Sequence, residues 1–522
     1  MTEPNRGALR RQLILRYVNV INRLGRIAID GQSLRERMTV RGIDFWAASQ
    51  LRESSPWKSN LFARIDYLRR ASAPQTLHSA SRLTGVLRAL RRVATGWRST
   101  GYLTINLVAS IGNRPETVSG DVLFVVFMPA SSSLVSDQEL LTRYFGRLPR
   151  HIQSMGLRSA VLFLPTDSLP SRMTRFERRT RKTMRRELES MTTTSHLSSN
   201  AVLRAWRNWL VMRRNAPSVS QIQSRCAQDA DLAGLSPLIR HDLEDALFGT
   251  SSVRVALLAE VFRSAIQSSR GIRAVIYPFE GQGWESLLES ACRAKGIQTV
   301  AYLHTIMKPW DLRAHTAMTE VPPQLLATHG PHDREELGHS LVNSVEVEAL
   351  RYEYLAHLSD HSVSPRHSVQ LLVVLGSDCE NSAMQLGDLM EEIRRSQIGW
   401  QVCVKQHPQC KLPSEAVGLT VVAGSLGEAL ESSSAVFLCG TAAPLDSYLF
   451  GLPTAALGAT DGYSMSPLEP DDVYFVGDTA ADVVRWLAGA AQRDSRRPDA
   501  ARYFDLTPGC DKWDRLIRSL VN

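Results

Sequence analysis

Two groups of residues in this sequence could carry chemistry, and each follows an apolar run. Glu280 lies in a glycine-rich stretch after residues 272–276, and His407-Pro408 comes shortly after residues 401–404. Such runs are typical of buried parallel strands, and ligands bind at the carboxyl ends of the strands in doubly wound sheets. A carboxylate base opposite a histidine that stabilises an anionic leaving group suits sugar transfer.

Glu280 is the first candidate catalytic residue. The strand before it should end at Pro278, and Gly281 and Gly283 after it permit close backbone approach or unusual dihedral angles. The alternative role for Glu280 is a turn residue bonded to backbone amides. Glu285 stands where the next helix should begin, so capping of that helix is the favoured role for its carboxylate.

His407 is the second candidate catalytic residue. Pro408 restricts the backbone beside it and should direct the imidazole out of the strand end. A histidine there can donate a hydrogen bond to a leaving phosphate. Lys405, two residues earlier on the same strand face, adds positive charge for donor binding.

A third candidate site is an anion-binding turn at Gly440-Thr441, which precedes a predicted helix over residues 443–450 that contains Asp446. Backbone amides at such a helix start, with the Thr441 hydroxyl, can bind phosphate. Gly376-Ser377 follows the first strand of the same series and is a comparable turn. A purely structural turn is the alternative in both places.

Acceptor contacts are expected from His304, Asp311 and Arg313, which follow another apolar run. His304 could equally be a hydrogen-bonded histidine at a strand end. The sequence shows no cluster with metal-ligand spacing and none of the usual phosphate-loop, dinucleotide or nucleophilic-serine motifs. It also lacks an Asp-x-Asp pair at a strand end. We therefore expect neither a metal nor another cofactor.

The elements that must position these residues form two series of alternating strands and helices, which predicts an α/β fold with parallel sheets. Residues 1–100 show helical spacing and predict a helical extension. A long buried helix is expected over 246–266, and a loop over 191–200. Strands are expected at 102–108, 121–128, 160–164, 274–277, 299–303 and 325–328, and again at 369–375, 400–404, 419–422, 435–438, 454–457 and 473–476.

The polar, proline-containing segment 357–367 separates the two series. We therefore predict a helical extension over 1–100, a Rossmann-like acceptor domain that contains the base over 101–360, and a Rossmann-like nucleotide-donor domain over 361–522. The two domains should face each other across a ligand-binding cleft.

Composition is that of a globular protein, with 43% hydrophobic and 22% charged residues. The seven cysteines are odd in number and form no Cys-x-x-Cys, so we expect small, buried, reduced thiols. Neither a signal sequence nor an apolar run long enough to cross a bilayer is present. These features predict a cytoplasmic protein.

The net charge of +9 comes from arginine, because only seven lysines occur. Clusters at residues 88–92 and 172–186 could contact an anionic membrane surface, since arginine binds phosphate oxygens well. A solvated helical surface is the alternative. Nucleic acid is not expected as a partner, because no nucleic-acid-binding motif accompanies the charge.

Several segments resemble a family of bacterial surface-carbohydrate (lipopolysaccharide O-antigen) biosynthesis proteins, piecewise from about residue 40 to about residue 470. The N-terminal signature of that family is similar to residues 44–46 and 53–59. The most specific segments are Tyr-Pro-Phe-Glu-Gly-Gln-Gly-Trp-Glu at 277–285, Ala-Tyr-Leu-His-Thr at 301–305 and Lys-Pro-Trp-Asp-Leu-Arg at 308–313.

More distantly, residues 279–281 with His407-Pro408 and Thr441 resemble the arrangement in bacterial sialyltransferases and Kdo transferases. Those enzymes have the GT-B fold and use donors that carry a cytidine nucleotide. The resemblance implies an inverting, metal-independent transfer in which Glu280 is the base, while His407, Lys405 and Thr441 bind the departing phosphate. The chain differs at Phe279, which replaces an acid, and at Ala442, which replaces a hydroxyl residue.

The resemblance thus implies a GT-B glycosyltransferase that builds O-antigen or capsule at the cytosolic face of the inner membrane. Its donor would be a nucleotide sugar, with a CMP-linked sugar favoured, and its acceptor a glycan or a lipid-linked glycan. Two alternatives stay open. CDP-glycerol polymerases share the C-terminal His-Pro, which suggests a CDP-polyol phosphotransferase. The chain could also be a non-catalytic scaffold that binds glycolipid or a partner transferase.

Overall fold

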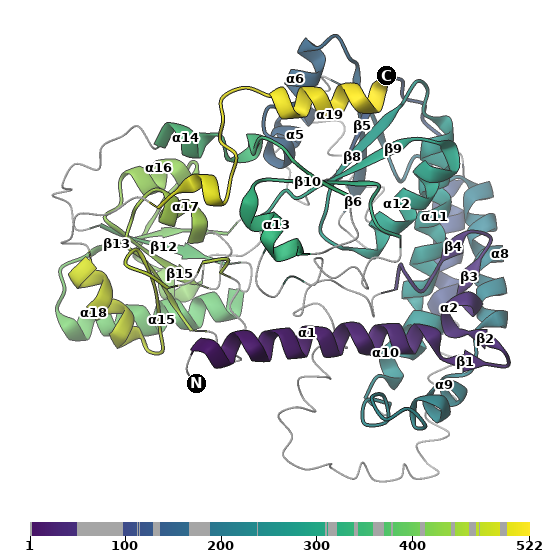
Figure 1. Ribbon diagram of the computed structural model, residues 1–522, viewed down its shortest axis with the longest axis horizontal. Helices are drawn as coiled ribbons and strands as arrows, with labels where there is room; N and C mark the ends of the chain where they lie inside the picture. The colour runs from purple at the N-terminus through teal and green to yellow at the C-terminus, as the bar shows by residue number, and fades with distance from the viewer. Residues whose placement is uncertain are drawn as a thin grey trace.

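The computed structural model places two parallel sheets, each flanked by helices, along the long axis of the molecule (Figure 1). The described residues are 3–49, 98–111, 113, 115–128, 136–165, 188–236, 238–307, 311, 321–338, 343–358, 370–376, 379–407, 413–439, 444–458, 466–468, 470–490 and 498–522.

The first sheet has the strand order β11-β10-β9-β8-β5-β6-β7, and all its strand pairs are parallel. The strand order reverses between the neighbouring strands β5 and β8, because later strands are added on opposite sides of this pair. Ligands bind at such a topological switch point. The strands are β5 (Val122–Met128), β6 (Ser159–Pro165), β7 (Glu189–Thr192), β8 (Ala274–Pro278), β9 (Gln298–Tyr302), β10 (Leu325–Thr328) and β11 (Ser344–Glu346).

The second sheet has the order β14-β13-β12-β15-β16-β17, again with parallel pairs only. Numbered along the chain, this is the 3-2-1-4-5-6 order of a Rossmann sheet, and its switch point lies between β12 and β15. The strands are β12 (Gln370–Leu375), β13 (Gln401–Lys405), β14 (Thr420–Val421), β15 (Ala435–Cys439), β16 (Thr454–Leu457) and β17 (Tyr474–Gly477).

Helices cover both faces of each sheet, as right-handed crossovers between parallel strands require. In the first domain they are α5 (Asp137–Phe145), α6 (Leu148–Ser154), α8 (Ser199–Asn215), α9 (Val219–Cys226), α10 (Arg240–Phe248), α11 (Thr250–Ser268), α12 (Gly283–Lys295) and α13 (Pro331–Leu337). In the second they are α15 (Cys379–Ser396), α16 (Leu426–Glu431), α17 (Pro444–Leu449) and α18 (Ala480–Ala490), and α14 (Tyr354–Leu358) precedes them.

The fold-class prediction is confirmed: the protein is α/β, with two Rossmann-like sheets in a GT-B-like arrangement. Eleven predicted strands are present, from residues 122–128 through to 474–477. The predicted strand at 102–108 is wrong, because residues 98–110 are helical. Its buried residues Leu103, Asn106 and Ser110 lie three and four positions apart, which is helical spacing.

Three other segments also differ from the sequence-based prediction. Within 191–200, expected to be a loop, residues 191 and 192 belong to β7, which pairs with β6 at the sheet edge. The helix expected over 246–266 is divided into α10 and α11, because Gly249 takes extended rather than helical backbone angles. The first domain also contains β11, which was not predicted.

The N-terminal extension is only partly helical in its described residues. It contains α1 (Glu3–Arg26) and α2 (Leu34–Arg37), and also two hairpins, β1 (Ala28–Ile29) with β2 (Gln32–Ser33) and β3 (Thr39–Val40) with β4 (Ile43–Asp44). The hairpins turn at residues 30–31 and 41–42, all of which have positive φ. A residue followed by glycine at such a turn is a hairpin signal that the helical interpretation passed over.

The C-terminal helix α19 (Asp511–Val521) returns from the second domain and packs against the first sheet (Figure 1). Trp513 and Ile517 are fully buried there with Val122 and Phe124 of β5. The helix is amphipathic, so its apolar face needs this partner. The last residues of the predicted 361–522 donor domain therefore contribute to the core of the first domain.

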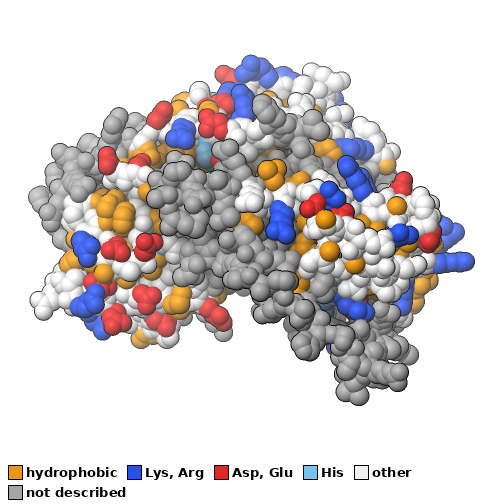
Figure 2. Space-filling view, turned by 60° about the horizontal axis from the view of Figure 1, so that its bottom comes forward, with side chains coloured by type: hydrophobic (Ala, Val, Ile, Leu, Met, Phe, Trp, Pro, Cys, Tyr) orange, Lys and Arg blue, Asp and Glu red, His pale blue; other side chains and the backbone are white. Residues whose placement is uncertain are grey.

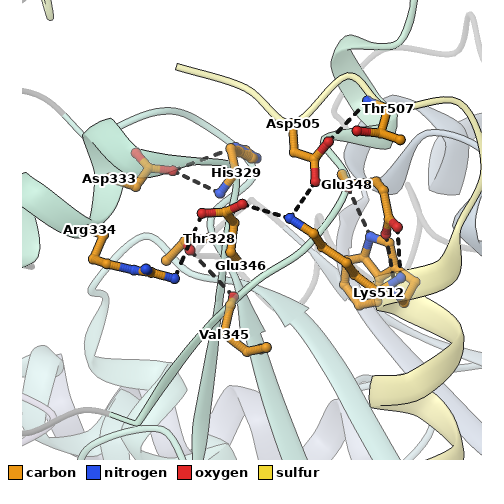
Figure 3. A network of polar contacts seen from close by, with 11 residues as sticks. Thr328, His329, Asp333, Arg334, Val345, Glu346, Glu348, Asp505, Thr507 and Lys512 are labelled. Carbon is orange, nitrogen blue, oxygen red and sulfur yellow. Dashed lines mark hydrogen bonds and ion pairs between the residues drawn. The ribbon is translucent and has the colours of Figure 1, made fainter. Parts of the chain in front are cut away.

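Polar contacts fix this returning segment beside β10 and β11 (Figure 3). Lys512 Nζ lies 2.5 Å from Asp505 Oδ2 and 2.6 Å from Glu346 Oε1. Burial lowers the pKa of Lys512, but Asp505 and Glu346 outweigh it and raise that pKa overall. Glu348 accepts hydrogen bonds from the backbone amides of Lys512 and Trp513 at 2.7 and 3.1 Å. The domains are thus connected twice, through residues 343–358 and through residues 498–510.

Cysteines in the described part of the chain are mostly buried free thiols, at positions 226, 292, 403, 439 and 510. Cys379 differs, because it is disulfide-bonded. The expectation of reduced, buried thiols is therefore wrong for Cys379, which lies exposed at the start of α15. Among the helices that the structure describes, none is both long and apolar enough to cross a membrane.

Candidate functional site

The turn after β8 is built around Glu285 rather than around Glu280. The buried Glu285 carboxylate accepts hydrogen bonds from the backbone amides of Glu280 at 2.8 Å and Gly281 at 3.0 Å. Glu285 is the third residue of α12, where a negative charge also suits the helix dipole. The structural role expected for Glu285 fits this geometry.

Both glycines of the turn are required by its geometry. Gly281 has φ +68°, in the left-handed region that favours glycine. A Cβ at Gly283 would lie 2.4 Å from the backbone oxygen of Ala48. Phe45 and Trp46, shortly before Ala48, are fully buried, so the chain that reaches the Glu280 turn at Ala48 is anchored in the core.

A chain of side-chain hydrogen bonds orients the Glu280 carboxylate. Trp284 Nε1 donates to Gln282 Oε1 at 3.0 Å. Because its oxygen is thus occupied, the Gln282 amide presents its nitrogen to Glu280 Oε2 and donates to it. Trp284 itself is fixed by edge contacts with Phe127 and Tyr277 at ring distances of 5.4 and 5.8 Å.

The other carboxylate oxygen of Glu280 faces His304. His304 Nε2 lies 3.4 Å from Glu280 Oε1, and the two side chains are 11% and 27% exposed. Glu280 follows β8 and His304 follows β9, so neighbouring strands bring the two together at the carboxyl edge of the sheet. The sequence predicted both residues but did not predict that they pair.

Tyr144 of α5 completes this group from a part of the chain that showed no signal in the sequence. Its ring lies 5.7 Å from the ring of His304. Burial, together with the nearby charge of Glu280, raises the pKa of Tyr144 to about 12. The phenol is therefore protonated at neutral pH and is a hydrogen-bond donor beside the carboxylate.

Arg351 and Tyr354 connect this group to the second domain. The Arg351 guanidinium donates to the backbone oxygen of His304. Tyr354 Oη donates to Asp446 Oδ1 in the first turn of α17, which follows β15. Burial raises the pKa of Asp446, while Tyr354 and Arg351 lower it less strongly. The carboxyl edges of the two sheets therefore lie on either side of residues 351–354.

Two of the predicted donor residues, Lys405 and Gly376, form hydrogen bonds within the second domain. Lys405 Nζ donates to the backbone oxygens of Val422, at 3.4 Å, and Gly424. The amide of Gly376 donates to Ser382 Oγ at 3.1 Å, and Ser382 Oγ donates to the Cys439 oxygen at 3.3 Å. Ser382 thus links the ends of β12 and β15 at the switch point.

His407 lies two residues beyond the end of β13 and is half-buried. Burial lowers its pKa, so the neutral imidazole is favoured and can donate from one ring nitrogen. Asp311, seven residues after His304 in the sequence, is half-buried. The remaining predicted site residues, Ser377, Pro408, Gly440, Thr441 and Arg313, lie outside the described residues.

Sequence reasoning missed Gln282, Tyr144 and Arg351 as parts of the site. Gln282 stands in the motif that was singled out, and its position between Glu280 and Trp284 was the available signal. Tyr144 and Arg351 stand far from every motif in the chain. In the described segments we find no group of three or more His, Cys, Asp or Glu residues that could bind a metal ion.

Comparisons with known proteins give fold likeness only. No family model matches the chain, and a search of curated proteins finds no match. UDP-GlcNAc 2-epimerase from Methanocaldococcus jannaschii aligns with a TM-score of 0.40 and 7% identity, over 77% of this chain and 99% of that chain. TcCGT1 in complex with UDP aligns at 0.38 and 12%, over 77% and 98%.

The glycosyltransferase SnogD from Streptomyces nogalater aligns with a TM-score of 0.32 and 12% identity, over 78% of this chain and 100% of that chain. Scores this low do not assign an activity.

Proposed function

We propose that this protein is a glycosyltransferase that moves a sugar from a nucleotide donor to a glycan acceptor, with inversion and without a metal ion. The observation that carries the proposal is the oriented Glu280 carboxylate at the switch point of the first sheet. It faces His304 at 3.4 Å. Arg351 donates to the backbone oxygen of His304, and Tyr354, three residues later, donates to Asp446 at the edge of the second sheet. Such convergence of ionisable groups at strand ends is typical of a catalytic site.

Glu280 acts as the general base in this proposal. It takes the proton of the acceptor hydroxyl while the acceptor oxygen bonds to the anomeric carbon. The bond between that carbon and the donor phosphate breaks on the opposite face, and its electron pair stays on the phosphate oxygen. Attack opposite to the leaving group inverts the anomeric configuration.

His304 and Gln282 position the base. The Gln282 hydrogen bond to one carboxylate oxygen and the His304 contact at 3.4 Å with the other fix the plane of the Glu280 carboxylate, which reduces the freedom lost when the acceptor binds. His304 donates from Nε2 in the tautomer that this geometry requires. Tyr144, protonated beside them, can donate to an acceptor hydroxyl or to the carboxylate.

The departing phosphate is assigned to the second domain. His407, at the carboxyl end of β13, donates to a phosphate oxygen as negative charge develops on it. Gly440 and Thr441 follow β15 at the switch point, where a nucleotide is expected to bind. Lys405 contributes by shaping the segment 422–424 at the same edge.

The resemblance of residues 279–281, His407-Pro408 and Thr441 to sialyltransferases and Kdo transferases supports a CMP-linked donor. The resemblance of residues 277–285 to surface-carbohydrate biosynthesis proteins supports a lipid-linked or growing surface polysaccharide as acceptor. Addition of CMP, CDP, UDP or GDP to the purified chain, with thermal unfolding as the readout, tests the donor. A ligand that binds the folded state raises the unfolding temperature. We expect CMP to give the largest shift.

Product mass after incubation with the matching donor and acceptor then separates the possible outcomes. A sugar added to the acceptor supports the proposal, whereas a polyol phosphate indicates the CDP-polyol alternative. No shift with any nucleotide and no product would indicate a non-catalytic scaffold. Activity that EDTA abolishes and Mg²⁺ restores would contradict the metal-independent mechanism.

A further inference from the structure

An exposed surface of mixed apolar and basic side chains lies on the first domain. It is formed by the helical residues 98–110, the adjoining Ile111 and α8. Leu203 and Leu210 of α8 are 51% and 49% exposed, and Ile105, Val108 and Ile111 are 51%, 63% and 72% exposed. Large aliphatic side chains in this state, gathered on one face, mark a contact surface more often than chance exposure does.

The outer face of α8 alternates leucine and arginine at helical spacing. Leu203, Arg207, Leu210 and Arg214 lie four, three and four residues apart and are all exposed. The opposite face, with Ala205, Trp209 and Met212, is buried in the core of the first domain. The sequence of α8 therefore places alternating leucine and arginine side chains on the exposed face of the helix.

The two helices lie next to each other, so their outer faces form one surface, called here the α8 surface. Ser110 Oγ lies 3.2 Å from Ser199 Oγ, and Leu103 and Val202 belong to the same buried cluster. Asn113 at the end of the shorter helix donates to the backbone oxygens of Thr194 and Leu197, just before α8 begins.

Charge on this surface has a single sign. Residues 98–111 and 199–215 contain five arginines and no aspartate or glutamate. Arg204 pairs with the buried Glu260, and Arg213 stacks over Trp209 at 5.3 Å, while Arg207 and Arg214 lie on the outer face. Figure 2 shows basic and hydrophobic side chains, with some acidic ones among them, over the right-hand end of the molecule.

We infer that the α8 surface docks on an anionic lipid bilayer. Aliphatic side chains enter the boundary between headgroups and acyl chains, and arginines beside them bind lipid phosphates. A nucleic acid would match the charge but not the exposed isoleucine, valine and leucine side chains. This inference goes beyond the proposed function, since it does not depend on sugar transfer, although it would bring the site close to a lipid-linked acceptor.

The test is flotation of the full chain with vesicles of phosphatidylcholine alone or with added phosphatidylglycerol. We expect partitioning to the anionic vesicles only, weakening as salt rises because charge interactions are screened. Leu203→Gln with Leu210→Gln, and separately Arg207→Gln with Arg214→Gln, should each weaken it roughly tenfold or more.

Matched controls are available on the second domain. Met384 and Val417 are 56% and 80% exposed, so Met384→Gln with Val417→Gln removes comparable apolar surface elsewhere. Arg395→Gln with Arg485→Gln removes two exposed charges there, and both control variants should partition like the unchanged chain. All variants should keep the unfolding temperature, because the substituted side chains lie on the surface.

Several outcomes would overturn the inference. These are equal partitioning to neutral and anionic vesicles, no partitioning at all, or an equal loss in the control variants. Binding to RNA in place of vesicles would indicate a nucleic-acid surface. Because the assay contains neither nucleotide nor acceptor, failure here leaves the transferase proposal to its own test.

Discussion

The two sheet edges that face residues 351–354 use their polar groups in different ways. At the edge of the first sheet, Glu280 and His304 are partly exposed and oriented toward each other. At the edge of the second, Lys405 and the Gly376 amide bond to Val422, Gly424 and Ser382 of their own domain.

This difference separates groups that are set for chemistry from groups that build the scaffold. The first edge presents a carboxylate that is already oriented without a ligand, as a base should be. In the proposed mechanism, the phosphate contacts in the second domain are assigned to His407, Gly440 and Thr441. Four substitutions at the two edges and one in the first-domain core test this contrast.

The largest effect is expected at Glu280. Glu280→Gln keeps the acceptor for the Gln282 hydrogen bond but removes the base, so turnover should fall by about 10² or more. Nucleotide affinity, measured by calorimetry, should stay nearly unchanged, because the proposed mechanism assigns the donor phosphate to the other domain. If Glu280→Gln retains most activity and His304→Gln abolishes it, then His304 is the base.

His407→Ala should lower turnover and nucleotide affinity together. Loss of a hydrogen bond to a charged group costs about 1.5–3 kcal/mol, or roughly 10–150-fold. Burial lowers the pKa of His407 in the folded protein below the pKa of an ordinary histidine. The contribution of His407 to stability is therefore present above the ordinary histidine pKa and is lost as pH falls through the folded-state pKa. A change in turnover with no change in nucleotide affinity would remove His407 from the donor site.

Glu285→Gln should act mainly on stability. The amide has one acceptor oxygen for the two backbone donors of Glu280 and Gly281, so the turn loses about 1.5–3 kcal/mol of stabilisation. Denaturant unfolding measures this loss, and the turnover of the folded fraction should fall less than in Glu280→Gln. If Glu285→Gln keeps full stability but has no turnover, then Glu285 is the general base and Glu280 the structural residue.

Lys405→Met should be milder. Since Lys405 donates to the oxygens of Val422 and Gly424 and is partly exposed, we expect about 1 kcal/mol of lost stability and nucleotide affinity within about threefold. Calorimetry and denaturant unfolding on the same sample test this. A tenfold loss of nucleotide affinity at unchanged stability would indicate that Lys405 contacts the donor directly.

The smallest effect should come from Glu289, buried between Tyr277 and Thr299 with hydrogen bonds of 2.8 Å to each. Burial raises the pKa of Glu289 in the folded protein above its pKa in the unfolded chain. The stability that Glu289 contributes is therefore fully present below the unfolded-state pKa and is lost as pH rises through the folded-state pKa. Glu289→Gln should therefore gain stability relative to the unchanged chain as pH rises above the ordinary pKa of glutamate. A constant difference in unfolding free energy would contradict this.

The strands of both sheets could be predicted because each is a short apolar run between turn residues, and such runs form buried parallel strands in any α/β context. Strands at the sheet edges were harder to predict from the sequence. Glu189–Thr192 and Ser344–Glu346 are partly polar, since an edge strand needs less apolar surface. Residues 102–108 misled because isoleucine, leucine and valine suit strands and buried helices alike.

What the sequence determined by itself is the pair of parallel sheets and the placing of Glu280 and His407 just beyond strand ends, because strand periodicity and turn chemistry are local. The tertiary structure alone decided that His304 pairs with Glu280, that Tyr144 joins them and that Tyr354 binds Asp446 of the second domain. It also gave Lys405 its backbone partners. Such contacts join segments tens to hundreds of residues apart, and they form only once the sheets have packed.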